Sequence, residues 1–209
     1  MSKETSSLRK IPPFFPPYWV TAIQSRQEFR SIQSVREIQM KRLDIAKALI
    51  AAGAILAPAM GWAQQAMLTG DTQINSSATT TTYGASTTLN VSPTNSALLQ
   101  FDLADILPSG VTAAQVLRAR LIVFPDTITT GGTVNLYQVT SAWNESTVTY
   151  ATKPTIAATP ATTLVIGVND SFHDFGVTAL VQSWITTPAS NFGVELQASG
   201  TTNIAIDSK

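Results

Sequence analysis

An alternation of apolar and polar residues at positions 133–154 constrains the fold of this chain more than any other feature. If this stretch is extended, Val134 and Leu136 point to one side of it, and Tyr137 and Val139 point to the other. A polar corner follows at 143–147, and the β-rich residues 147–150 predict a second strand after it. We therefore expect a sandwich built from short β-strands.

Further short apolar runs follow one another through the rest of the chain, separated by turn-forming residues. They occupy residues 89–91, 97–103, 116–124, 162–168, 193–198 and 203–206. Many short strands at fairly even spacing favour an all-β sandwich or jelly roll over alternating βαβ units.

The run at 116–124 predicts one strand with a buried face and a solvent-facing side. Arg118 and Arg120 share the solvent-facing side. The buried face is expected to consist of the alternate apolar residues Leu117, Ala119, Leu121 and Val123.

One segment departs from the period of two. Its apolar residues follow the i, i+3, i+4, i+7 spacing of one helix face, and they are Val177, Leu180, Val181 and Trp184. We expect one short amphipathic helix over residues 177–185, which closes one end of the sandwich and places Trp184 in the core.

The charge changes sign along the chain, although the formal net charge is zero. Up to Ala63 there are nine basic and four acidic residues, and from Gln64 onward there are four basic and nine acidic residues. The second part therefore carries a net charge of −5, which gives no electrostatic basis for binding nucleic acid.

Residues 40–63 have the pattern of a signal peptide. Lys41 and Arg42 follow Met40, an uncharged apolar run covers 48–60, and small residues lead to Ala63, after which we expect cleavage. A transmembrane anchor is the alternative, but the run is shorter than the ~20 apolar residues that span a bilayer. We therefore expect a secreted or cell-surface protein with no membrane anchor after cleavage.

Residues 1–39 contain a proline-rich run and no coherent periodicity. We interpret them as an unstructured or mis-assigned extension, with translation starting at Met40; the alternative is a cytoplasmic tail on an uncleaved anchor. Residues 64–209 then form the folded domain. Because the chain has no cysteine, the packed core must supply its stability, and no thiol can act as a nucleophile or metal ligand.

A series of short motifs runs in order through residues 68–209. They are Asp71-Thr72, Tyr83-Gly84, the segments 98–103, 119–121, 134–139, 143–150, 177–184 and 191–194, and Asp207-Ser208-Lys209. Together they resemble the DNRLRE domain family, a carbohydrate-binding-module-like family related to the repeat of archaeal disaggregatases. The resemblance implies a jelly-roll β-sandwich in secreted and surface proteins, often beside polysaccharide-degrading modules, with some members binding acidic polysaccharides such as alginate.

The sequence departs from this family at its end. Members usually continue past the Asp-Ser-Lys segment into a final strand, whereas this sequence stops at Lys209. We interpret the chain as a fragment that lacks its last strand, which would leave a neighbouring strand edge unpaired. The alternative is that an adjoining chain supplies the strand.

Aromatic residues near the polar corner are the candidate ligand contacts, since aromatic planes stack on sugar rings. Trp143 is the first candidate, with Tyr150, Tyr137 and Tyr83 as its neighbours. We favour the alternative that Trp143 plugs the end of the core while Glu145 or Ser146 satisfies the turn.

Arg118 and Arg120 are candidate contacts for the carboxylates of an acidic sugar chain. A solvated strand face is the simpler interpretation of the two arginines, and the acidic net charge of the domain disfavours a uronate ligand.

The sequence offers little support for catalysis. His173 and Asp174 are adjacent, and adjacent residues of a strand point to opposite faces. The single histidine forms no familiar zinc cluster. We predict a non-enzymatic protein without a cofactor. A structural calcium ion is left open, with four candidate ligands that cannot be ranked, Asp71, Asp126, Asp170 and Asp207.

Two functions remain. The first is a secreted, non-catalytic carbohydrate-binding module that attaches to an extracellular or cell-wall polysaccharide, with a neighbouring catalytic module or chain as a further partner. The second is a structural cell-surface or adhesion domain without a sugar site. Exposed aromatic residues on one face favour the first, and fully buried aromatic residues with an unpaired edge strand favour the second.

Overall fold

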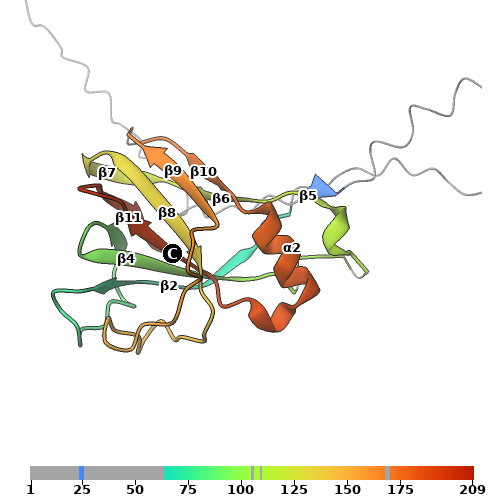
Figure 1. The fold of residues 1–209 in the computed structure, drawn as a ribbon, viewed down its shortest axis with the longest axis horizontal. Helices are drawn as coiled ribbons and strands as arrows, with labels where there is room; N and C mark the ends of the chain where they lie inside the picture. Colours follow the sequence, from blue (N-terminus) through green and yellow to red (C-terminus); the bar gives the residue numbers. More distant parts are fainter. Residues whose placement is uncertain (1–23, 26–63, 105, 109, 168–169) are drawn as a thin grey trace, which may run out of the picture.

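The computed structural model describes residues 24–25, 64–104, 106–108, 110–167 and 170–209 (Figure 1). The expected signal peptide at 40–63 lies outside the described residues, as does the extension at 1–39 apart from β1 (Gln24–Ser25). Strand β1 pairs antiparallel with β5 (Val116–Arg118). All other described elements belong to the stretch that begins at residue 64.

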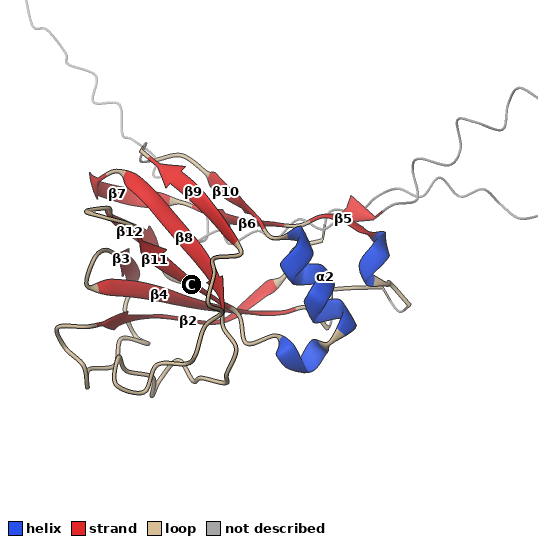
Figure 2. Cartoon of the chain, viewed as in Figure 1, coloured by secondary structure: helices blue, strands red, loops and turns tan. Residues whose placement is uncertain are grey.

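This stretch consists of short strands and one α-helix (Figure 2). Its remaining strands are β2 (Met67–Asn75), β3 (Thr88–Val91), β4 (Asn95–Asp102), β6 (Arg120–Val123), β7 (Pro125–Thr130), β8 (Gly132–Gln138), β9 (Thr162–Ile166), β10 (His173–Gly176), β11 (Val194–Ala198) and β12 (Asn203–Asp207). Its helical elements are η2 (Ala113–Gln115), α2 (Thr178–Thr186) and η3 (Pro188–Ser190).

The strands form a sandwich in which every described pairing is antiparallel. One layer is a five-stranded sheet in the order β2-β4-β11-β8-β9. The other layer contains a three-stranded sheet, β3-β12-β7, and a two-stranded ribbon of β6 and β10. The chain passes repeatedly from one layer to the other, as in a jelly roll. The prediction of an all-β sandwich with one short helix is confirmed.

Alternate residues of facing strands build the main core between the layers. Leu99 of β4 and Leu196 of β11 point inward from the five-stranded sheet, and Ile204 and Ile206 of β12 point inward from the opposite layer; all four are at most 2% exposed. Phe175 of β10 completes this layer at 1% exposure. The alternation of apolar and polar residues in the sequence therefore corresponds to the side chains that pack between the two sheets.

Helix α2 lies at one end of the sandwich, as predicted (Figure 2). Its Leu180, Val181 and Trp184 are buried in the main core. The amide of Gln182 donates a hydrogen bond of 2.9 Å to the carbonyl oxygen of Val116, which ties the helix to β5. The spacing of its apolar residues thus predicted both the helix and its buried face.

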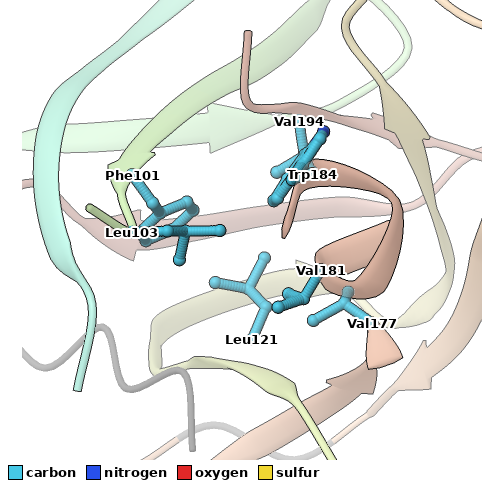
Figure 3. A pocket seen from close by; sticks show the side chains of 7 residues that line it. All are labelled: Phe101, Leu103, Leu121, Val177, Val181, Trp184 and Val194. Carbon is cyan, nitrogen blue, oxygen red and sulfur yellow. The ribbon is translucent and has the colours of Figure 1, made fainter. Parts of the chain in front are cut away.

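A small apolar cavity lies where α2 meets the strands (Figure 3). It is lined by side chains of the main core, namely Phe101, Leu103, Leu121, Val177, Val181, Trp184 and Val194. The indole nitrogen of Trp184 is buried and has no hydrogen-bond partner within the described part of the chain. Because sugar hydroxyls would lose their bonds to water here without replacement, this cavity is a feature of the core and not a carbohydrate site.

The expected single strand at 116–124 is wrong, since the structure divides it into β5 and β6 at Ala119. The N–H of Ala119 donates to Thr178 Oγ1 (3.0 Å), and its carbonyl oxygen accepts the N–H of Val177 (3.0 Å). The backbone at Ala119 is thus hydrogen-bonded to the start of helix α2. As a result, the alternation of inward-pointing and outward-pointing side chains does not continue unchanged from β5 into β6. Leu117 is 42% exposed and Val116 is buried, the reverse of the expectation for this part of the run.

The expected second strand at 147–150 is also wrong, because this stretch is a loop. Val148 donates its N–H to the carbonyl oxygen of Asn144 (2.9 Å), and Thr149 donates its N–H to Thr152 Oγ1 (3.0 Å). Local partners therefore take the backbone donors that a strand would use. Among the described residues, no helix is both long and apolar enough to cross a membrane.

Candidate functional site

The long loop 139–161 connects β8 to β9 and builds a second apolar cluster. This outer cluster has four buried members, Ile74, Leu98, Val139 and Val148. Trp143, Tyr150, Ile156 and Phe192 are partly buried and pack against them. Leu98 is the next residue along β4 from the inward-pointing Leu99, so the cluster lies on the outer face of the five-stranded sheet.

Trp143 is held within this outer cluster by specific contacts. Its indole N–H donates a 2.8 Å hydrogen bond to the carbonyl oxygen of Phe192. Its ring lies against Gly70 of β2, where an added Cβ atom would be 3.6 Å from the indole Cη2. These contacts hold Trp143 against the outer face of the sheet and not at the end of the main core, where we had expected it, and stacking of its ring on a sugar stays a prediction.

Glu145 joins the polar corner to two distant parts of the chain. Both of its carboxylate oxygens lie 2.7 Å from Lys209 Nζ. The buried carboxylate of Asp71 accepts hydrogen bonds through Oδ2 from Ser208 Oγ (2.7 Å) and from the N–H of Lys209 (2.8 Å). A side chain at Gly84 would collide with the backbone of Glu145. Four of the short motifs noted in the sequence are therefore in contact with one another around Glu145 and Asp71.

The turn at the corner is closed by Asn144 and Ser146. The side-chain oxygen of Asn144 accepts hydrogen bonds from the N–H (3.0 Å) and the hydroxyl (2.6 Å) of Ser146. The side chain that satisfies the backbone of the turn is therefore Asn144 and not Glu145 or Ser146 as expected, and Glu145 is bound to Lys209.

Tyr137 lies on the same outer face, next to a carboxylate that sequence reasoning did not select. The register places Glu195 of β11 between Leu98 of β4 and Tyr137 of β8, so their three side chains are neighbours across the sheet. Glu195 is only 1% exposed, and Gln197 Nε2 donates a hydrogen bond of 2.8 Å to it. Tyr137 itself is half-buried.

Burial raises the pKa of Glu195. Hydrogen bonds from the side chains of Gln197 and Ser96 and the positive charge of Lys153 offset part of this increase. A buried carboxyl group that holds a neighbouring amide fixes the orientation of that amide. We therefore regard Glu195 as a positioning residue for Gln197.

Tyr150 and Lys153 approach this group from the loop. Lys153 Nζ lies 4.3 Å from the centroid of the Tyr150 ring, which is a cation–π contact. Lys153 is exposed and Tyr150 is half-buried. We call the set Tyr137, Tyr150, Lys153, Glu195 and Gln197 the Tyr137 site.

A polar row continues from the Tyr137 site across the sheet. Gln197 pairs with Ser96 on one side and with Asn135 on the other, and Asn135 pairs with Thr163 of β9. Ser96, Gln197 and Asn135 are half-buried, and Thr163 is exposed. Aromatic rings beside amides and hydroxyl groups can stack on a sugar ring and bind its hydroxyl groups.

The two arginines selected from the sequence lie elsewhere. Arg118 is on β5, which pairs with β1, and Arg120 is on β6, in the other layer of the sandwich. Arg120 forms an ion pair of 2.7 Å with Asp174 of β10. The structure therefore brings Tyr137 and Tyr150 to one site and separates them from the arginines.

The His173–Asp174 neighbours do not act as a pair. The imidazole Nε2 of His173 lies 3.1 Å from the hydroxyl of Ser171, whereas Asp174 binds Arg120. Adjacent positions on β10 thus face different partners, as expected for a strand.

The predicted calcium ligands are dispersed. Asp71 is occupied by Ser208 and Lys209. Burial, followed by the charge of Asp126, raises the pKa of Asp207. Throughout the described ranges, no group of three or more His, Cys, Asp or Glu residues is arranged to hold a metal ion. Structural calcium stays a prediction.

Sequence reasoning missed Glu195, Gln197 and Lys153. Glu195 and Gln197 alternate with Val194 and Leu196 along one strand, so their shared face was readable. Their position beside Tyr137 depends on the pairing of β11 with β8, which joins residues far apart in the chain.

The outer face of the five-stranded sheet thus presents tyrosine rings beside amide groups, which are side chains that can contact a sugar. The sequence profile of carbohydrate-binding module family 96 matches residues 63–209. The chain therefore belongs to carbohydrate-binding module family 96. Modules of this kind are generally non-catalytic and typically extracellular. A comparison with curated proteins found no match.

Proposed function

We propose that this chain is a secreted, non-catalytic carbohydrate-binding module that attaches to an extracellular or cell-wall polysaccharide through the Tyr137 site. Membership of carbohydrate-binding module family 96 is the observation that carries the proposal. The finer resemblance to DNRLRE domains, export through residues 40–63 and a neighbouring catalytic module or chain as partner belong to the same proposal.

In the Tyr137 site, some side chains contact the sugar and one side chain positions another. The rings of Tyr137 and Tyr150 supply apolar faces for the C–H face of a sugar, and Lys153 supplies donors at its edge. Glu195 binds Gln197 Nε2, so the amide oxygen of Gln197 is left to accept a bond from a sugar hydroxyl. At 1% exposure, Glu195 acts through Gln197 and does not contact the sugar.

Charge favours an uncharged sugar chain as the ligand. Residues 64–209 carry a net charge of −5, which repels a polyuronate at long range. Within the Tyr137 site, the single cation Lys153 already lies near the Glu195 carboxyl group. We therefore place neutral polysaccharides ahead of alginate or pectin.

The second candidate function is a structural cell-surface domain without a sugar site. It is favoured by the corner at 143–147, where Trp143 binds Phe192 and Glu145 binds Lys209. In this case the aromatic residues of loop 139–161 serve only to cover the outer face of the sheet.

Affinity electrophoresis of the full chain in gels containing xylan, β-glucan, galactomannan, alginate or pectin, with and without calcium, tests the proposal. The wild-type chain should be retarded by an uncharged polymer. Tyr137→Ala should weaken this affinity about tenfold or more and Lys153→Ala less, whereas Met67→Ala, which shortens an exposed side chain on β2, should leave it unchanged. A folded wild-type chain that no polymer retards would contradict the proposal and favour the structural domain.

A further inference from the structure

The outer face of the β6–β10 ribbon carries a pair of aromatic rings that the Tyr137 site does not use. The register pairs Asp174 with Ile122 and His173 with Val123. Extending this register by one residue places Phe172 opposite Phe124. Their ring centroids are 5.2 Å apart with an interplanar angle of 59°, a tilted contact typical of aromatic pairs.

Phe172 is the most accessible aromatic residue in the described part of the chain. Its exposure is 61%, whereas the other described aromatic side chains are half-buried or buried. Phe124 is half-buried, and its ring contacts that of Phe172. A ring that contacts Phe124 and still keeps 61% of its surface exposed is suited to stacking, because it is held in place before the ligand arrives.

The same face offers hydrogen-bonding groups beside the rings. Alternation along β6 places Arg120, Ile122 and Phe124 on one side of the strand. Arg120 Nη1 donates a 2.7 Å hydrogen bond to Asp174 Oδ2, and their side chains keep 31% and 46% of their accessible surface. Donors and acceptors therefore lie next to the rings, with no net charge.

The far end of this face is open. Gly176 lies opposite Arg120, and a Cβ atom added there would meet nothing within 4 Å. From Phe172 to Gly176 the strand extends for about 13 Å, since each residue adds about 3.3 Å. We call the face formed by Arg120, Ile122, Phe124, Phe172 and Asp174 the β6–β10 strip.

We infer that the β6–β10 strip is a second carbohydrate-contacting surface, which takes an uncharged sugar chain. The inference rests on the proposed function. One sugar ring stacks with its C–H face on Phe172, and the hydroxyl groups of the next units bind Arg120 and Asp174. An acidic sugar would have to displace Asp174 from Arg120, so a neutral chain is preferred.

The strip belongs to the opposite layer of the sandwich from the Tyr137 site (Figure 1). One chain can therefore contact two polymer strands, or two parts of one polymer, and gain avidity from the second contact. Binding to a polymer should then be tighter than binding to a short oligosaccharide, and the chain should cross-link a soluble polymer.

The test uses the full chain with soluble xylan, β-glucan and galactomannan and with their hexasaccharides. Phe172→Ala should weaken polymer binding about tenfold and abolish the turbidity caused by cross-linking, while hexasaccharide binding at the Tyr137 site is retained. Met67→Ala is the matched control, since Met67 is 70% exposed and lies on β2, outside the strip. Circular dichroism melts verify that each variant is folded.

The outcomes separate the two proposals. If Phe172→Ala behaves as Met67→Ala while Tyr137→Ala loses binding, the second surface is wrong and the proposed function stands. If Phe172→Ala loses all binding and Tyr137→Ala loses none, the strip is the main surface and the Tyr137 site is wrong. A folded wild-type chain that binds none of these glycans overturns both.

Discussion

The outer faces of the two layers both carry aromatic side chains, but these side chains differ in how far they are exposed. On the five-stranded sheet, loop 139–161 covers an aromatic cluster, and the indole of Trp143 donates to the carbonyl oxygen of Phe192. On the β6–β10 strip, Phe172 contacts Phe124 and is 61% exposed. The covered face teaches that an aromatic residue in a prominent motif can serve the fold. The face with the exposed ring is the one where we propose that a ligand binds.

The ion pairs on the two faces also differ in what they connect and in how far they are exposed. Lys209 connects Glu145 to the buried Asp71 and so joins loop 139–161 to β2. Arg120 and Asp174 form an exposed pair on two strands that are already hydrogen-bonded to each other. The first pair holds distant segments together, whereas an exposed pair of the second kind contributes little to stability.

The largest effect that distinguishes the two faces is expected for Trp143→Ala. Removing the indole leaves a space against Gly70 and an unpaired carbonyl oxygen on Phe192, so the free energy of unfolding should fall by about 3 kcal/mol. Urea denaturation followed by circular dichroism measures this loss. A change below about 1 kcal/mol would show that the covered face is not structural.

Asp71→Ala should cost about 2 kcal/mol. The substitution removes the acceptor of Ser208 Oγ and of the Lys209 N–H and leaves Lys209 Nζ with Glu145 and the carbonyl oxygen of Thr69 as partners. The same denaturation experiment measures the change, with Asp174→Ala as the control for an exposed carboxylate. Equal losses in the two variants would contradict the structural difference between the two ion pairs.

Glu195→Gln should change how stability depends on pH. The folded-state pKa of Glu195 is raised by burial, so its contribution to stability is complete below the ordinary value of about 4.3 and is lost as the pH rises through the raised value. The advantage of the variant over the wild type should therefore grow with pH in weakly acidic solution, by about 1.4 kcal/mol for each unit by which the pKa is raised.

Thermal melts of both proteins at a series of pH values provide the measurement. Asp207, whose pKa is also raised by burial, is unchanged in the variant and contributes equally to both curves. Parallel curves for wild type and variant would contradict the raised pKa of Glu195.

The smallest effect on stability is expected for Phe172→Ala. Because most of this ring is already in water, the free energy of unfolding should change by less than about 0.5 kcal/mol. Urea denaturation beside Trp143→Ala gives the direct contrast. A loss comparable to that of Trp143→Ala would mean that Phe172 belongs to the core and is not available to a ligand.

Much of the fold could be predicted from the sequence, because period-two and helical patterns report burial directly. The strands at 89–91 and 203–206 and helix α2 followed from such patterns. The strand expected at 147–150 failed because side chains such as Thr152 satisfy the backbone locally, which composition does not reveal. The run at 116–124 failed at Leu117 because helix α2 interrupts it at Ala119.

Less of the candidate site could be predicted. Tyr137 and Tyr150 were selected as aromatic residues near a corner, and the structure places both at one site. Glu195 and Phe172 depend on strand pairing between distant parts of the chain, which determines what faces Tyr137 and Phe124. The sequence shows which residues alternate, whereas the register decides which of them meet.

The most direct test of the central claim is the mapping of amide chemical shifts during titrations with the hexasaccharides of xylan, β-glucan and galactomannan. We predict that the largest changes fall on β8 and β11 around Tyr137, Glu195 and Gln197, with smaller changes on β6 and β10 around Phe172. Changes confined to other parts of the surface, or no changes for any of the sugars, would contradict the account.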